Sequence, residues 1–309
     1  MTRPLFSVVI PAYNRSDVIA PTLESVRGQT LEDFECLVVD DGSSDGETLR
    51  GVVEGLNDVR FRYIRRENGG GGAARNTGID AAVGRYIAFL DSDDLFLPTK
   101  LAVVSQHLPG DPGVVLYSQN LVDRGDPDRL WVRPDRAIAP GERVPTYLFI
   151  AGQFIQTSTI VMDADLARRV RFDAQLRKGQ DLDFCVRLEA AGARFQMLEN
   201  PLSIWRDHAE AGRTSRTRGY EQPEAWLATH RHLMTDREAA GYRATSLAYY
   251  WGWSKPVSAM TAIVAGVPAG VGVPVAVRQM ARTFLPRELY RRMVDTLVRW
   301  RGRRSPARA

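Results

Sequence analysis

Three carboxylates lie close together in Asp91-Ser-Asp93-Asp94, directly after the apolar run Tyr86 to Leu90. Carboxylates at the end of a buried strand repel one another unless a positive charge is bound beside them. A hard divalent cation that also binds phosphate oxygens would supply this charge. The motif therefore indicates a site for a metal ion and a phosphorylated ligand.

The elements that position this motif can be read from residues 6–90, where short apolar runs alternate with segments of helical period. This alternation predicts βαβ units, and hence an α/β fold with a mostly parallel central sheet flanked by helices. Strands are expected at Phe6 to Pro11, Glu35 to Asp40, Phe61 to Arg65 and Tyr86 to Leu90. The intervening helices are expected from Ser16 to Gly28, over Leu49 to Leu56 and from Gly72 to Ala82.

Polar or glycine-rich segments follow all four strands, where open parallel sheets bind their ligands. These segments are Pro11 to Asn14, Asp40 to Asp45, Glu67 to Asn76 and Asp91 to Asp94. Taken singly, an Asp-Gly-Ser turn also fits a plain helix entry, and a run of glycines also fits a flexible connector. The first segment has no G-x-G-x-x-G, and the chain has no G-x-x-x-x-G-K-[ST], so a dehydrogenase and a P-loop protein are excluded.

The motifs agree in order and spacing with one family. The chain resembles the family 2 glycosyltransferases of the GT-A fold over roughly residues 5–210. The stretches that carry the resemblance are Val8-Val-Ile-Pro-Ala-Tyr-Asn14, Val38-Val-Asp-Asp-Gly-Ser-Ser-Asp45, Gly72-Ala-Ala-Arg-Asn-Thr-Gly78 and Phe89-Leu-Asp-Ser-Asp-Asp94, the last resembling the D-x-D metal motif. Gly179-Gln-Asp-Leu-Asp-Phe184 takes the place of the family's E-D motif, although Gln180 stands where glutamate is commoner.

The resemblance implies a nucleotide-sugar site. Its implied members are Pro11, Ala12, Tyr13, Asn14, Asp40, Asp41, Arg75, Asp91 and Ser92. Within this set, Asp40 or Asp41 is implied to accept a hydrogen bond from the nucleotide base, Tyr13 to stack on that base, and Arg75 to lie near the nucleotide.

The resemblance also implies a cofactor, Mg²⁺ or Mn²⁺, held by Asp93 with Asp91 nearby. The ion would stabilise the departing diphosphate. His208 is a further implied ligand of the metal or diphosphate, because related enzymes often present a histidine after the last strand; a solvated surface histidine is the other interpretation.

Asp181 is implied as the catalytic base. An aspartate of ordinary pKa, near 3.9, is ionised at neutral pH and can take the proton of an attacking hydroxyl late in the transition state. Family precedent implies a single displacement that inverts the anomeric carbon. Asp183 fits equally well as an acid in the first turn of a helix, where the helix dipole favours negative charge.

These observations predict a metal-dependent inverting glycosyltransferase. It would move a sugar from a nucleotide-diphosphate donor, with a UDP-sugar favoured, to a hydroxyl of a glycan, lipid-linked or small-molecule acceptor in polysaccharide or glycoconjugate synthesis. The alternative is a catalytically inactive sugar-nucleotide or glycan-binding protein of the same fold, and the joint presence of Asp91, Asp93 and Asp181 counts against it.

Composition predicts the domain organisation. A glycosyltransferase domain is expected over residues 1–212, with a nucleotide-binding half at about 1–97 and an acceptor-side half at about 98–212; a helical region is expected over 213–309. Residues 256–277 carry no charge but contain three Gly and three Pro, which disfavours a transmembrane helix. Packing on the main domain and lying at a membrane surface both stay open for this stretch.

The net charge of +4 is unevenly distributed. Residues 278–309 hold ten arginines against Glu288 and Asp295, a net charge of +8, so residues 1–277 carry −4. This pattern predicts a basic amphipathic helix that contacts anionic lipid, and no nucleic-acid partner.

Localisation is predicted from the cysteines and the N-terminus. Cys36 and Cys185 lie in apolar runs and fit buried thiols in a reducing compartment, and no secretory signal pattern follows Met1. A cytoplasmic protein is expected, with peripheral attachment to the inner face of the plasma membrane as the further expectation.

Overall fold

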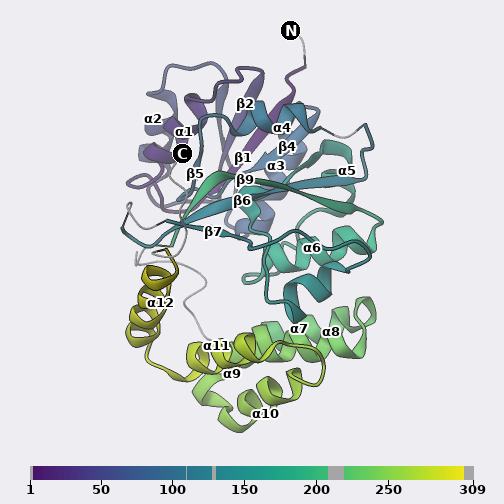
Figure 1. The fold of residues 1–309 in the computed structure, drawn as a ribbon. Coiled ribbons are helices and arrows are strands. Elements are labelled where there is room, and N and C mark those ends of the chain that lie inside the picture. The colour runs from purple at the N-terminus through teal and green to yellow at the C-terminus, as the bar shows by residue number, and fades with distance from the viewer. Residues whose placement is uncertain (1–2, 109, 127–129, 208–218, 303–309) are drawn as a thin grey trace. The chain divides into compact units, whose positions relative to one another are not determined.

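The computed structural model describes residues 3–108, 110–126, 130–207 and 219–302. The chain divides into two compact units (Figure 1). The first comprises Met1–Gly125, Val132–Gly141 and Phe154–Ala209, and the second comprises Asp126–Trp131, Glu142–Gln153 and Glu210–Ala309. The first unit is built on a β-sheet with helices packed on it, and the second is formed mainly by helices.

The first half of the sheet has the predicted βαβ arrangement. Strands β1 (Phe6–Ala12), β2 (Phe34–Asp40), β3 (Phe61–Arg65) and β4 (Tyr86–Phe89) run parallel in the order β3-β2-β1-β4. Helices α1 (Ala20–Arg27), α2 (Gly46–Glu54) and α3 (Gly71–Ala81) connect them. Every residue of β2 is buried, as expected for a strand covered on both faces.

One helix boundary was predicted wrongly. Helix α1 begins at Ala20 and not after Ser16, whose backbone N–H donates to Oδ2 of Asp45 at 3.0 Å. Proline lies in the first turn of α1, the position in a helix where its missing N–H has the least effect.

The second half of the sheet is mixed in direction. It adds β5 (Leu95–Phe96), β6 (Val114–Asp123), β7 (Trp131–Arg133), β8 (Val161–Asp163) and β9 (Arg194–Arg206), and the order across the sheet is β3-β2-β1-β4-β8-β6-β9-β5, with β7 on β6. Helices α4 (Lys100–Gln106), α5 (Ala164–Val170) and α6 (Gln180–Ala190) belong to the same unit.

The elements of this half are less regular. Strand β9 pairs with β6 with shifts in register. A turn of 3₁₀ helix, Thr157–Thr159, comes shortly before β8. Helix α5, which starts after the N-cap Asp163, was not predicted.

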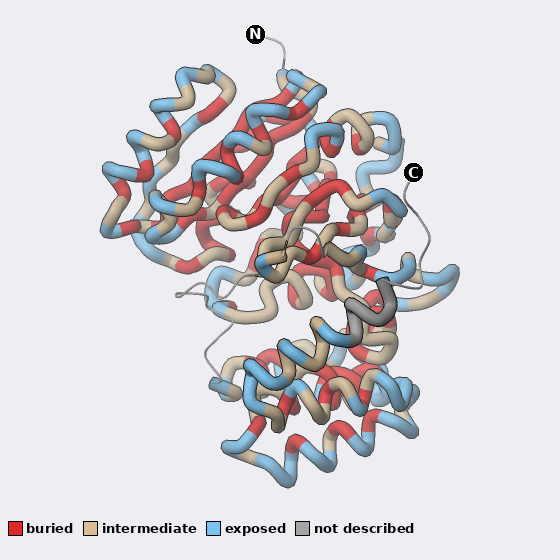
Figure 2. Tube along the Cα trace, turned by 60° about the vertical axis from the view of Figure 1, so that its left-hand side comes forward, coloured by how far each residue is buried: buried red, intermediate tan, exposed pale blue. Residues whose placement is uncertain are grey.

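The core of the first unit lies between the central strands and their helices, where Figure 2 shows the buried positions concentrated. Cys36 lies on β2 and Cys185 on α6. Both thiols are free and fully buried, as predicted, and burial raises the pKa of each well above the ordinary value.

The second unit contains α7 (Glu221–His230), α8 (Asp236–Tyr242), α9 (Ala248–Trp251), α10 (Pro256–Gly266), α11 (Val273–Phe284) and α12 (Arg287–Gly302). Short turns of 3₁₀ or π helix at Thr146–Ile150, Arg231–Leu233, Arg243–Leu247 and Gly252–Ser254 also belong to it. A capping box of Thr235 and Glu238 starts α8. Within the described part of the chain, no helix has both the length and the apolar character needed to cross a bilayer.

Candidate active site

The carboxyl ends of β1, β2 and β4 lie side by side at one edge of the sheet. Ala12 is in register with Asp40, and the Asp41 N–H donates to the Ala12 carbonyl at 2.8 Å. On the other side of β1, the Leu90 N–H donates to the Val9 carbonyl at 3.0 Å. The segments that follow these strands therefore lie next to one another.

A cluster of polar side chains joins three elements at this edge. Asp91 follows β4 and forms an ion pair with Arg75 of α3. Arg75 also donates to Oε1 of Gln180, the first residue of α6, at 2.6 Å. The structure thus brings together the predicted residues Arg75, Asp91 and Asp181, which lie far apart in the sequence.

Asp181 lies in the first turn of α6, beside this cluster. Its Oδ1 accepts the Leu182 N–H at 2.9 Å. Burial raises the pKa of Asp181, and the Asp91 carboxylate raises it further, while the Leu182 hydrogen bond and the Arg75 charge act in the opposite direction. A carboxylate that holds a proton more tightly is a stronger general base.

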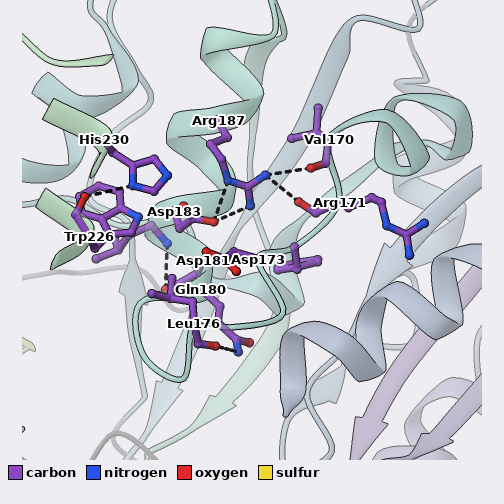
Figure 3. Close-up of polar contacts among 12 residues, drawn as sticks. Val170, Arg171, Asp173, Leu176, Gln180, Asp181, Asp183, Arg187, Trp226 and His230 are labelled. Atoms are coloured by element: carbon purple, nitrogen blue, oxygen red, sulfur yellow. Dashed lines mark hydrogen bonds and ion pairs between the residues drawn. The ribbon is translucent and has the colours of Figure 1, made fainter. Parts of the chain in front are cut away.

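Asp183 forms a buried ion pair within the protein. Its side chain is fully buried and pairs with Arg187 one turn along α6 (Figure 3). Arg187 also donates to the carbonyl oxygens of Val170 and Arg171, each at 2.8 Å. Asp183 therefore helps Arg187 anchor α6 to the end of α5.

The three carboxylates that follow β4 lie in different environments. Asp91 and Asp93 are partly exposed, whereas Asp94 is fully buried. Burial raises the pKa of Asp94 well above the ordinary value, and the neighbouring carboxylates Asp91 and Asp93 raise it further. Its oxygens accept hydrogen bonds from Gln156, Ser158 and the backbone of Arg206. Asp91 and Asp93 are thus the carboxylates of this motif that a metal ion could reach.

The donor set fits a hard divalent cation, although it is incomplete. Two carboxylates suit Mg²⁺ or Mn²⁺, which commonly take further ligands from substrate phosphates and water. Among the described residues, no group of three or more His, Cys, Asp or Glu side chains is arranged to hold a metal. His208, the third predicted ligand, lies outside the described residues.

The predicted nucleotide-binding loop is ordered by contacts with the loop after β2. Pro11 and Ala12 end β1, and Tyr13 is 52% exposed. Asn14 has a positive φ of 51°, and its Oδ1 accepts from the Ser44 N–H at 2.9 Å. The exposed ring of Tyr13 is compatible with stacking on a base.

Asp40 and Asp41 already have donors within the protein. Asp40 is fully buried and accepts from Tyr63 and the Ser43 N–H. Asp41 accepts from Arg66 and from the backbone N–H groups of Gly69 and Gly70 at 3.0 and 2.6 Å. A nucleotide base would have to displace or share one of these donors, so a contact between either carboxylate and the base stays a prediction.

The glycine run Gly69 to Gly72 is required by the local backbone geometry. Gly70 has a φ of 91°, and its N–H donates to Asp41. A Cβ on Gly72 would come within 2.7 Å of the Asp173 carbonyl oxygen. Glycine at these positions therefore allows α3 to start close to the segment that leads into α6, and the run is not a plain flexible connector.

Ser92, a predicted member of the nucleotide-sugar site, is buried, and its carbonyl accepts from Thr22 at 3.0 Å. The sequence analysis missed Gln156 and Ser158, whose side chains donate to Asp94. The polar run Gln156-Thr-Ser-Thr159 directly before an apolar strand was the available signal.

Comparison with known proteins identifies the family. The family model described as Glycosyl transferase family 2 matches residues 7–174, more than half of the chain. The chain belongs to this family. This family 2 glycosyltransferase is 35% identical over 256 residues to the amylovoran biosynthesis glycosyltransferase AmsB of Erwinia amylovora, a match that covers 78% of this chain and 83% of AmsB.

Solved structures confirm the predicted fold of this family 2 glycosyltransferase. Residues 1–349 of S. aureus TarS in complex with UDP-GlcNAc superpose with a TM-score of 0.60 at 20% identity, covering 98% of this chain and 93% of that one. The mannosyltransferase PcManGT of Pyrobaculum calidifontis, in complex with GDP-Man and Mn²⁺, gives a TM-score of 0.57 at 18% identity, with coverages of 96% and 86%. The protein has a GT-A-type fold with C-terminal helices.

Proposed function

We propose that this enzyme is a metal-dependent, inverting glycosyltransferase that uses a nucleotide-diphosphate sugar. The observation that carries the proposal is the meeting of Arg75, Asp91 and the first turn of α6 at the carboxyl ends of the strands. It supports the proposal because Asp91, the proposed metal ligand, lies near Asp181, a partly buried carboxylate of raised pKa. Leaving-group stabilisation and proton removal are the two functions that glycosyl transfer to a hydroxyl requires.

Each residue has a distinct role in this proposal. Asp91 and Asp93 would hold Mg²⁺ or Mn²⁺, and the bound ion would neutralise charge that develops on the departing diphosphate. Arg75 orients the Asp91 carboxylate. Asp181 accepts the proton of the acceptor hydroxyl as its oxygen attacks the anomeric carbon from the side opposite the diphosphate, so the configuration inverts.

The donor and acceptor are proposed from the comparisons. The titles of the two structures name UDP-GlcNAc and GDP-Man as ligands, and a UDP-sugar is the donor we favour. The name of AmsB refers to amylovoran biosynthesis, and we propose an acceptor hydroxyl on a growing glycan, a lipid-linked sugar or a small molecule. Residues 1–97 would bind the donor and residues 98–212 would face the acceptor.

Nucleotide-sugar binding with and without Mn²⁺ tests this function. We expect Mn²⁺ and one of a panel of UDP-, GDP- and dTDP-sugars to raise the melting temperature together, because a ligand at 100 times its Kd adds about 2.7 kcal/mol of stability. Slow hydrolysis of the same donor should need the metal and stop with EDTA. A protein that neither binds nor hydrolyses any donor would contradict the proposal, and binding without turnover would favour the inactive sugar-nucleotide-binding alternative.

We also propose a cytoplasmic location at an anionic membrane surface. Helix α10 carries no charge and exposes Val257, Met260 and Val264 along one face, with Val257 68% and Val264 63% exposed. The hydroxyl of Thr261 on the same helix donates to backbone carbonyls of its own turn, which leaves little unsatisfied polarity there. An uncharged exposed face followed by a segment of net charge +8 suits anionic lipid.

Vesicle co-sedimentation tests the membrane proposal. The full-length enzyme should sediment with phosphatidylcholine vesicles that contain phosphatidylglycerol and stay in solution with phosphatidylcholine alone. Val264→Glu should weaken binding, whereas Val59→Glu, at a position that is 98% exposed in the first unit, should not. Equal sedimentation of both variants would contradict the role of α10.

A further inference from the structure

A buried serine connects the backbone of Asp91 to the interior of the first unit. Ser158 is fully buried, and its Oγ accepts the Asp91 N–H at 3.0 Å. The same hydroxyl donates to Oδ2 of Asp94 at 2.7 Å. The carbonyl oxygen of Ser158 accepts from Nζ of Lys100 at 3.0 Å, so the serine is held through both its side chain and its backbone.

Asp94 is the centre of this network. Besides Ser158, its Oδ2 accepts from the side-chain amide of Gln156, and that amide oxygen accepts from Asn120 at 2.7 Å. Its Oδ1 accepts the backbone N–H of Arg206, the last residue of β9, at 3.1 Å. One carboxylate of the loop after β4 therefore binds Gln156, Ser158 in the turn Thr157–Thr159, and the end of β9.

We propose that Asp94 and Ser158 are positioning residues for the metal-binding loop: Asp94 orients the hydroxyl of Ser158, and that hydroxyl fixes the backbone of Asp91 and hence the direction of its carboxylate. The proposal rests on the proposed metal-dependent function and assigns a role to two fully buried residues that are not among the proposed metal ligands. The Asp94 N–H also donates to the Asp91 carbonyl at 3.0 Å, which closes the loop into a turn.

The physical reason is that a metal ligand binds well only when its direction is fixed before the ion arrives. Partners in the outer shell of a metal site typically change metal affinity by about 10- to 100-fold when they are removed. Ser158 holds the loop through the Asp91 backbone, which leaves the Asp91 carboxylate free to pair with Arg75 and to meet a cation.

Serine-to-alanine substitutions at two fully buried positions of the first unit, Ser158 in the turn Thr157–Thr159 and Ser203 on β9, give a matched test. Ser158→Ala removes a buried hydroxyl with two hydrogen-bond partners, whereas Ser203→Ala removes one that is equally buried and has no hydrogen-bond partner. We expect Ser158→Ala to raise the Mn²⁺ concentration that half-saturates UDP binding on the order of tenfold. UDP binding without metal should stay unchanged, and Ser203→Ala should behave as wild type. Equal Mn²⁺ dependence in the two variants would overturn the proposal.

Amide hydrogen exchange of the metal-free enzyme separates this proposal from the proposed function. Ser158→Ala should speed exchange at the Asp91 amide, because the acceptor of that N–H is lost, and Ser203→Ala should not. Asp94→Asn, which keeps the side-chain shape, should give the same change if it folds. Unchanged exchange in Ser158→Ala would overturn the positioning role even if the enzyme needs Mn²⁺. Conversely, wild-type UDP binding that is indifferent to Mn²⁺ would overturn the metal-dependent function alone.

Discussion

The guanidinium group of Arg75 forms an ion pair with the carboxylate of Asp91. Because Arg75 also donates to Gln180, a single side chain connects α3, the loop after β4 and the start of α6. The Arg75 guanidinium lies 5.2 Å from the centre of the Phe172 ring, which adds a cation–π contact to the same arrangement. The relative positions of the proposed metal ligand and the proposed base therefore depend on this arginine.

Arg75→Lys should lower kcat by about tenfold or more, because an ammonium group cannot reproduce the planar fork that reaches two partners at once. The measurement is steady-state transfer with the donor found in the binding screen. Arg50→Lys on the exposed side of α2 serves as the control, since its ion pairs are solvent-exposed. An unchanged kcat in Arg75→Lys would show that simultaneous contacts to Asp91 and Gln180 are not needed for transfer.

Asp181→Asn should reduce transfer by a factor of about 10² to 10⁴, the usual contribution of a general base. UDP affinity should remain within about twofold of wild type, because the proposed role of Asp181 is toward the acceptor. Kinetics and calorimetric titration of the same preparation check both points. Loss of UDP binding in this variant would contradict the assigned role.

Gln180→Glu should move the acid limb of the pH–rate profile to higher pH. The pKa of Asp181 is already raised by burial and by Asp91, so transfer should fall as the pH drops through that raised value. A new carboxylate next to Asp181 would disfavour its ionised form further. Profiles of kcat/KM against pH for the wild type and Gln180→Glu test this prediction. An acid limb that stays in place or moves to lower pH in the variant would contradict it.

Lys100→Met should change how stability depends on pH. Burial lowers the pKa of Lys100 from 10.5 to about 7, so between those values the unfolded chain binds one more proton than the folded one. The wild-type free energy of unfolding should therefore rise with pH relative to the variant, by up to about 1.4 kcal/mol per pH unit. Urea unfolding at several pH values measures the difference, and parallel curves for wild type and Lys100→Met would contradict it.

The sequence could predict those helices and strands that a local pattern of apolar residues specifies. Strand β2 is apolar toward both faces of the sheet, and each residue in it is buried. Strand β9 could not be predicted as one strand, because Glu199-Asn-Pro201 has the composition of a turn; its continuity comes from pairing with β6 across shifted registers. Non-local pairing overrode local propensity there.

The candidate site could be predicted to the extent that its residues lie in recognisable motifs. Arg75, Asp91 and Asp181 were predicted as site residues from the sequence, and the structure brings them near one another, while their roles stay a prediction. The complete burial of Asp94 could not be predicted, because Asp94 directly follows the partly exposed Asp93 in the chain. Its hydrogen-bond partners Gln156 and Ser158 are more than sixty residues away. The spacing of acidic residues does not reveal which of them faces inward.

The two buried thiols provide internal reporters of local opening. Cys36 lies in the central sheet and Cys185 in the helix that carries Asp181, and neither should react with an alkylating reagent until its surroundings open. Alkylation of Cys185 ahead of Cys36 would mean that α6 detaches while the sheet stays folded. The natural cysteines thus allow movement of the proposed catalytic helix to be followed by mass spectrometry without engineered labels.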